Sequence, residues 1–283
     1  MAKTKKLFAT LSRRGPHRAL RGDLAFAGLP GVLYTPESGA GLPAVAFGHD
    51  WLVRPQRYRG LLEHLASWGI VAAAPDTETS MVPSVLNLAA DLGRALDVVT
   101  SVRIGTGAIS VDPARLALAG HGFGASAAVF AAAGLQSAAN PPKAVGALFP
   151  RATVPDAAGP AAGLQVPGMV LVSPQARLSV HEHDATLCSQ WPGSTLRIVA
   201  KAKPARLAEG LVLGGLTGLP RAERRTQRYS RALLTGYLLY QLTGDRRYAD
   251  FADADALLPH TVAPDADAEP VELGDKIAAL LGR

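Results

Sequence analysis

The segment from Leu116 to Ala128 restricts the possible folds more than any other part of the sequence. An apolar run, Leu116–Ala119, precedes Gly120-His-Gly-Phe-Gly124, and small residues follow it. This order predicts a buried strand that turns sharply into a helix. The glycine spacing matches the motif Gly-x-Ser-x-Gly, in which the turn exposes a nucleophilic serine. Here the central residue is Gly122, so the attacking hydroxyl is missing. On these residues alone, an ordinary glycine-rich turn or a phosphate-binding loop also fits.

Apolar runs alternate with segments of helical spacing along most of the chain. Expected strands cover residues 23–28, 32–36, 43–47, 70–74, 143–149, 168–172 and 195–199, and expected helices cover 56–68, 84–102, 182–190 and 224–241. Such alternation implies right-handed crossovers and a mostly parallel sheet with helices on both faces. At 283 residues, 48% hydrophobic and 18% charged, the chain suits a single α/β domain with a large core.

Four further segments, in this order along the chain, support the same kind of fold as the motif around Gly122. They are Gly48-His-Asp-Trp51, Leu65–Asp76, Val111–Leu116 and Tyr229–Phe251. With them, the chain resembles the α/β-hydrolases of the cutinase-like polyester-hydrolase, chlorophyllase and dienelactone-hydrolase branch from about residue 23 to residue 251. The resemblance implies a single-domain α/β-hydrolase fold over this range. It also implies where a Ser–Asp–His triad would be found.

The three triad positions implied by the resemblance hold other residues. Gly122 stands at the serine position. The aspartate is expected just after strand 168–172, but residues 173–180 contain no acid, and Arg177 lies near the expected place. The histidine is expected after strand 195–199, where residues 200–207 contain none and Lys203 is the nearest match. Because acyl transfer needs a nucleophile, a base and an orienting carboxylate, the sequence predicts a catalytically inactive protein, with no catalytic residue.

The expected oxyanion-binding segment is also altered. In this branch it reads His-Gly-aromatic, whereas here it is His49-Asp50-Trp51. A carboxylate beside this site opposes an oxyanion unless it is paired or protonated. His121 and Phe123 flank Gly122 and complete the vestigial site. A rearranged ester or lactone hydrolase using Asp50 and His121 is the alternative hypothesis, and a purely structural role for the histidines is also open.

The two ends of the chain carry opposite charge. Residues 1–22 have no acid and are predicted to form a basic arm, whereas residues 252–283 are predicted to be an acidic tail with a short terminal helix. The arm is expected either to be solvated, to bind an anionic membrane surface, or to fold onto the tail. Nucleic-acid binding is disfavoured because no recognition motif accompanies the charge. The candidate membrane-binding residues are Lys3, Lys5, Lys6, Arg13 and Arg14.

Neither a metal nor a cofactor is expected. The cluster His181-Glu-His-Asp184 spaces its histidines two apart, which does not place them on one helix face. Cys188 is the only cysteine, and its segment lacks a partner for nucleophilic chemistry. The sequence therefore predicts a pseudoenzyme that binds a protein partner or a small apolar ligand. Its expected place is the cytoplasm, with the inner membrane surface as a possible site of attachment.

Overall fold

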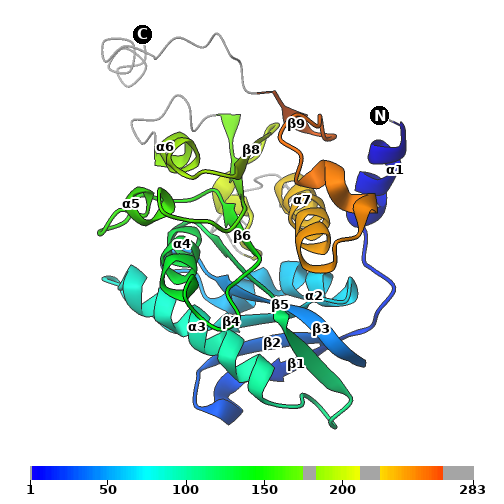
Figure 1. The fold of residues 1–283 in the computed structure, drawn as a ribbon, viewed down its shortest axis with the longest axis vertical. Helices are drawn as coiled ribbons and strands as arrows, with labels where there is room; N and C mark the ends of the chain where they lie inside the picture. The colour runs from blue at the N-terminus through cyan, green and yellow to red at the C-terminus, as the bar shows by residue number, and fades with distance from the viewer. Residues whose placement is uncertain (1, 175–182, 211–223, 264–283) are drawn as a thin grey trace, which may run out of the picture.

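A nine-stranded mixed sheet forms the centre of the molecule in a computed structural model, which describes residues 2–174, 183–210 and 224–263 (Figure 1). The strand order is β1-β2-β4-β3-β5-β6-β7-β8-β9. Strands β3 to β8 run parallel, β2 is antiparallel to β1 and β4, and β9 is antiparallel to β8. The strands are Ala19–Asp23 (β1), Gly31–Pro36 (β2), Gly39–Gly48 (β3), Val71–Pro75 (β4), Ile109–His121 (β5), Ala144–Leu148 (β6), Gly168–Val172 (β7), Ser194–Val199 (β8) and Thr261–Val262 (β9).

Helices cover both faces of this sheet. They are α1 (Ala2–Leu11), α2 (Arg59–Ser67), α3 (Val85–Ser101), α4 (Phe123–Leu135), α5 (Ala158–Ala161), α6 (His183–Gln190) and α7 (Arg224–Thr243). Helices α3 to α6 lie on one face, and α2 and α7 lie on the other, with α1 against α7 (Figure 1). The predicted α/β architecture, with a mostly parallel sheet and helices on both faces, is confirmed.

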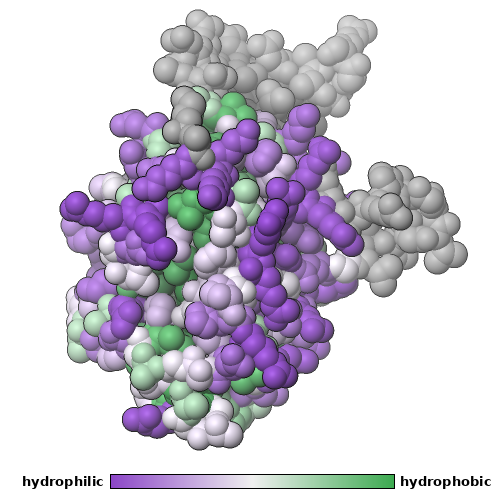
Figure 2. All heavy atoms as spheres, turned by 90° about the vertical axis from the view of Figure 1, so that its right-hand side faces the viewer, coloured by the Kyte–Doolittle hydropathy of each residue, from purple (hydrophilic) through white to green (hydrophobic). Residues whose placement is uncertain are grey.

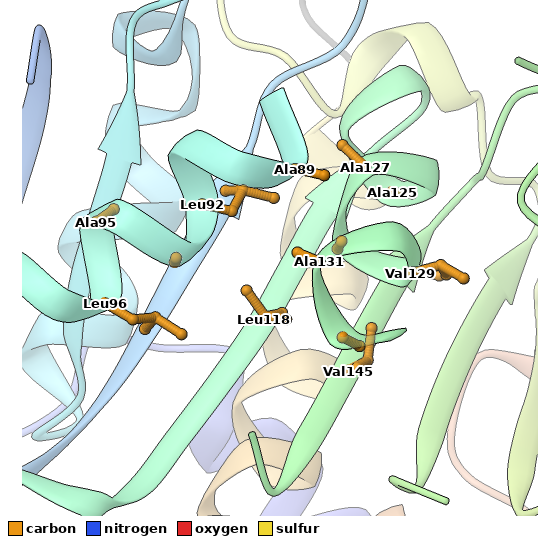
Figure 3. Packing of buried hydrophobic residues seen from close by; sticks show 14 of the residues in the cluster. Ala89, Leu92, Ala95, Leu96, Leu118, Ala125, Ala127, Val129, Ala131 and Val145 are labelled. Atoms are coloured by element: carbon orange, nitrogen blue, oxygen red, sulfur yellow. The ribbon is translucent and has the colours of Figure 1, made fainter. Parts of the chain in front are cut away.

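The central strands contribute side chains to two separate cores because successive residues of a strand point to opposite faces. Leu118 belongs to the core beneath α3 and α4, whereas its neighbours Ala117 and Ala119 belong to the core beneath α2 and α7. Figure 3 shows Leu118 between Leu92 of α3 and the alanines of α4. Burial of a strand on both faces explains its continuous apolar sequence.

The opening strands differ from the prediction. Asp23 ends β1 instead of starting a strand, and its side chain accepts a hydrogen bond from the Ala25 N–H at the start of a 3₁₀ helix, Leu24–Ala27. Gly28 closes this turn at φ 74°. Because its side chain accepts the Ala25 N–H, Asp23 acts as the N-terminal cap of the 3₁₀ helix. Strand β1 lies at the edge of the sheet and is mostly exposed, so it lacks the apolar pattern by which the buried strands were found.

The sequence predicted that residues 1–22 form a separate basic arm. The structure corrects this prediction for residues 2–22, which are part of the folded domain. Helix α1 packs on α7, and Phe8 and Leu11 are buried. The Phe8 ring stacks on Phe251, with 6.5 Å between ring centroids. In this arrangement, Phe8 and Leu11 pack in the core of the protein. The basic side chains Lys3, Lys5, Lys6, Arg13 and Arg14 stay exposed. Helix α1 lies on the right-hand side of Figure 1, which Figure 2 turns toward the reader and on which many side chains are hydrophilic.

The first part of the expected acidic tail is also part of the body. Leu258 is buried, and Thr261 and Val262 form β9. The buried Arg197 guanidinium of β8 donates hydrogen bonds to three carbonyl oxygens of this segment, at residues 253, 254 and 256, and to the carbonyl of Asp250 just before it. The remaining tail, residues 264–283, with its predicted terminal helix, lies outside the described residues. Within the described part of the chain, no helix is both long and apolar enough to span a bilayer.

Candidate functional site

The site is built on the sharp turn between β5 and α4. Gly122 occupies this turn at φ 56° and ψ −116°, a conformation that glycine adopts with little strain. Two neighbouring glycines allow the helix to approach the sheet. A Cβ on Gly120 would lie 2.1 Å from the Gly124 carbonyl oxygen, and a Cβ on Gly124 would lie 2.2 Å from the Gly48 carbonyl carbon. The three glycines of the motif therefore serve the turn and the close contact of α4 with β3 and β5.

The carboxylate of Asp50 fills the space above Gly122. A Cβ added to Gly122 would lie 2.0 Å from Asp50 Oδ1 and 2.3 Å from its carboxyl carbon. Asp50 follows β3 by two residues and is 4% exposed. Because the carboxylate takes this volume, a side chain at position 122 and the present position of Asp50 exclude each other.

Two backbone N–H groups and one guanidinium hold this carboxylate. Asp50 Oδ1 accepts hydrogen bonds from the N–H of Trp51, at 2.8 Å, and of Phe123, at 3.0 Å. Arg151 Nε lies 3.3 Å from the same oxygen. These N–H groups come from the loop after β3 and from the start of α4, which are the two sources of an oxyanion hole at such a turn. Asp50 thus satisfies the donors that would otherwise stabilise a developing oxyanion.

A second chain of hydrogen bonds connects Asp50 to His121. The Asp50 N–H donates to Tyr58 Oη at 3.1 Å, and the Tyr58 hydroxyl lies 2.8 Å from His121 Nδ1. The His121 ring also interacts with the backbone carbonyl of Pro204, which can only accept. We therefore assign the ring proton to Nε2 and the Tyr58 hydroxyl as the donor to Nδ1. Complete burial lowers the pKa of His121 to about 4, against the opposing effect of Asp50, so the ring is neutral at pH 7. Burial also raises the pKa of Tyr58, and its hydroxyl stays protonated.

The structure does not form the direct Asp50–His121 pair that the alternative hypothesis required. The Tyr58 hydroxyl separates the two residues and occupies Nδ1 of the histidine. His49 is held in a similar way, with its Nδ1 2.9 Å from the Asp50 carbonyl oxygen and its Nε2 2.7 Å from the Thr77 carbonyl oxygen. Both imidazoles are thus engaged by the surrounding protein, in agreement with the structural role considered for them.

The chlorophyllase family model matches residues 25–174, which is 150 of the 283 residues. The chain belongs to the chlorophyllase family. This family is part of the α/β-hydrolase superfamily, and the sheet order and the β5–Gly122–α4 turn agree with that assignment. The resemblance expected from the sequence is confirmed. No curated protein matches the chain.

The matched range ends at residue 174, shortly after β7. The positions expected for the acid and the histidine of the triad follow β7 and β8. Arg177, near the expected acid, lies outside the described residues. Lys203, near the expected histidine, is exposed, and its backbone N–H donates to Thr226 Oγ1 at 3.0 Å. Phe123 contributes its N–H to the site, but its ring is packed in the core. Trp51 is 43% exposed at the surface of the site.

Two residues of the site were missed by the sequence analysis. Arg151 stands three residues after β6, and the ends of parallel strands are where functional side chains gather, so its position gave a usable signal. Its backbone also binds the turn, since its N–H donates to the Gly122 carbonyl at 3.2 Å and its carbonyl accepts from Ser126 Oγ at 2.7 Å. Tyr58 gave no such signal, because only the folded position of the 3₁₀ helix Pro55–Tyr58 brings it between Asp50 and His121.

No group of three or more potential metal ligands occurs among the described residues. His181 lies outside that part of the chain, and the side chains of His183 and Asp184 at the start of α6 are not described. The Cys188 thiol is partly buried 3.1 Å from Ser194 Oγ, and burial raises its pKa. A raised pKa disfavours the reactive thiolate.

The low pKa of His121 predicts a loss of stability in mild acid. A histidine titrates near pH 6.5 in the unfolded chain and near pH 4 here, so acid favours unfolding. The contribution of such a buried histidine to the free energy of unfolding is fully present above pH 6.5. It falls by about 1.4 kcal/mol per pH unit as the pH drops toward 4. His64, whose pKa burial also lowers to about 4, contributes in the same direction.

Urea denaturation at pH 7, 6 and 5 measures this dependence. His121→Gln is expected to reduce the slope of stability against pH by about one proton, because it removes one of the titrating groups. His17→Gln is the matched control, since it makes the same substitution at an exposed histidine. Equal slopes for wild type and His121→Gln would contradict the neutral, buried state of this ring.

Proposed function

We propose that this member of the chlorophyllase family is a pseudoenzyme that acts by binding rather than by hydrolysis. The observation that carries the proposal is the Asp50 carboxylate, which fills the space above Gly122 and accepts both N–H groups of the oxyanion-binding position. Hydrolysis of an ester needs a nucleophile and empty donors at this place. Here position 122 has no side chain, and the donors are satisfied from within the chain.

The surroundings of the turn support this proposal. Ser126, the next hydroxyl after the turn, is buried and donates to the Arg151 carbonyl. His121 is neutral and bonded to Tyr58. Between Pro174 and Arg228 the sequence has histidines only at positions 181 and 183, before β8 and not after it. The segment after β8, where the family pattern places the catalytic base, therefore supplies no histidine.

The binding partner is proposed to be another protein or a small apolar ligand, and the place of action is proposed to be the cytoplasm. We also propose that residues 2–22 are attracted to an anionic membrane by their charge alone. The buried side chains of Phe8 and Leu11 support the body of the protein, and the exposed lysines and arginines of this segment would supply the attraction.

Absence of hydrolysis is tested with p-nitrophenyl esters of acetate, butyrate and octanoate, and with a fluorophosphonate that labels activated serines. The wild type is expected to show no turnover above buffer and no mass increase after treatment with the fluorophosphonate. Ser126→Ala and His121→Ala serve as matched variants. Turnover that disappears in His121→Ala, or an adduct that disappears in Ser126→Ala, would overturn the proposal and favour a rearranged hydrolase.

A further inference from the structure

Exposed apolar side chains gather on two loops next to the site. The loop after β3 presents Trp51 and Leu52, which are 43% and 47% exposed, and the loop before α3 presents Met81 and Val82, which are 69% and 89% exposed. We call these four residues the apolar rim. Single exposed apolar side chains are ordinary, whereas a group of them on adjoining loops indicates an interaction surface.

Direct contacts fix the two loops to each other. The Trp51 indole Nε1 donates to the Met81 carbonyl oxygen at 3.2 Å. Arg54, two residues after Leu52, forms an ion pair with Asp76 at the end of β4, at 2.5 Å. The apolar rim is therefore one surface and not two independent loops.

In the ion pairs around the apolar rim, the arginine side chains are exposed and their carboxylate partners are largely buried. The Arg54 side chain is 65% exposed and its partner Asp76 only 7%, and the Arg151 side chain is 54% exposed and its partner Asp50 only 6%. The remaining acid of the second loop, Glu78, accepts hydrogen bonds from the Ser84 N–H and the Asn87 amide at the start of α3. A partner thus meets apolar side chains flanked by guanidinium groups, while two of the three carboxylates lie beneath the surface.

We propose that the apolar rim docks on an anionic lipid bilayer. Exposures of 69% and 89% place Met81 and Val82 at protruding tips with few neighbours. A deformable apolar phase can surround such tips, whereas a folded partner would need a matching cavity. Tryptophan favours the bilayer interface, and arginines near anionic headgroups each add about 1 kcal/mol. This surface is distinct from α1, and the proposal stands whether or not the protein hydrolyses a substrate.

Vesicle binding of the full-length protein tests the proposal. The probes are vesicles of phosphatidylcholine alone and of phosphatidylcholine with 30 mol% phosphatidylglycerol, at about 150 mM salt, where surface charges are partly screened. The wild type is expected to sediment with the anionic vesicles and to shift its tryptophan emission to shorter wavelength, with the shift lost in Trp51→Phe. The double substitution Met81→Ser and Val82→Ser is expected to weaken partitioning by at least about tenfold, because two apolar side chains no longer leave water.

Matched variants separate this surface from the alternatives. Phe26→Ser removes an aromatic side chain that is 61% exposed on the 3₁₀ helix after β1, and it should leave binding unchanged. Lys3→Gln, Lys5→Gln and Lys6→Gln together test α1. The proposal is overturned if the wild type does not bind the anionic vesicles, if Phe26→Ser weakens binding as much as the rim variant, or if only the lysine variant loses binding. Docking of a protein at the rim, with no affinity for vesicles, would also overturn it.

Discussion

Asp50→Ala is expected to lower the free energy of unfolding by about 2–4 kcal/mol, although Asp50 is a charged residue in the interior. The substitution leaves the N–H groups of Trp51 and Phe123 without their acceptor, and it leaves Arg151 without its ion pair. Buried donors without a partner cost more than the net value of the hydrogen bonds they lose. Because Arg151 is half exposed, water replaces part of its interaction, so most of the loss comes from the two N–H groups. Urea denaturation at pH 7 measures the change.

Two comparisons identify the cause of this loss. Asp50→Asn retains an oxygen that can accept both N–H groups, so it should cost only about 1 kcal/mol. Asp76→Ala is the matched control, because the Asp76 side chain is only 7% exposed and is paired with an arginine. Its carboxylate accepts hydrogen bonds from the side chains of Arg54 and Gln56, whereas that of Asp50 accepts from backbone N–H groups. It should therefore lose less stability than Asp50→Ala.

Formate offers a more specific test of the same site. In Asp50→Ala, a free carboxylate can enter the space above Gly122 and accept the same donors, and a ligand that binds only the folded state raises its stability. About 50 mM formate is expected to raise the Tm of Asp50→Ala by about 2–5 °C relative to chloride, with no such effect on the wild type or on Asp76→Ala. Equal effects of formate on all three proteins would contradict an anion-binding site at the turn.

Gly122→Ser is expected to destabilise the protein by about 2–4 kcal/mol and to give no esterase turnover. The residue adopts φ 56°, which strains any side chain. Its new Cβ would also lie 2.0 Å from Asp50 Oδ1, so the carboxylate must leave its donors. The strain alone could be anticipated from the motif, but the collision with Asp50 could not. Denaturation and the p-nitrophenyl ester assay measure the two outcomes.

A double-mutant cycle separates strain from collision. Combining Gly122→Ser with Asp50→Gly removes the carboxylate that the serine would meet, so the pair should be more stable than the sum of the two single changes predicts by about 1–2 kcal/mol. The double variant restores a hydroxyl and frees the donors, but His121 remains bonded to Tyr58. We expect no turnover from it. Strict additivity would contradict the collision, and turnover would reveal a base in a place that we have not assigned.

The elements near Gly122 were predictable because their signals are local. A buried parallel strand is apolar throughout, a helix repeats its apolar residues every three or four positions, and a tight turn uses glycine. The edge strand Ala19–Asp23 escaped prediction because only one side of it pairs and its side chains are mostly exposed. Folding of residues 1–22 onto the tail was one of the alternatives, and Phe8 does contact His260. The packing of α1 on α7 escaped prediction, since Phe8 contacts Phe251 across a sequence separation of more than 240 residues.

The sequence by itself determined the class of fold, the family and the position of the turn at Gly122, and it placed Asp50 next to the expected oxyanion-binding segment. Only the tertiary structure decided what this aspartate does. Its carboxylate lies over Gly122 because the loop after β3 meets the start of α4 there, with Arg151 supplied by a third strand end and Tyr58 by a fourth segment. Contacts among four separate segments depend on the packing of the whole sheet, and a one-dimensional pattern does not record them.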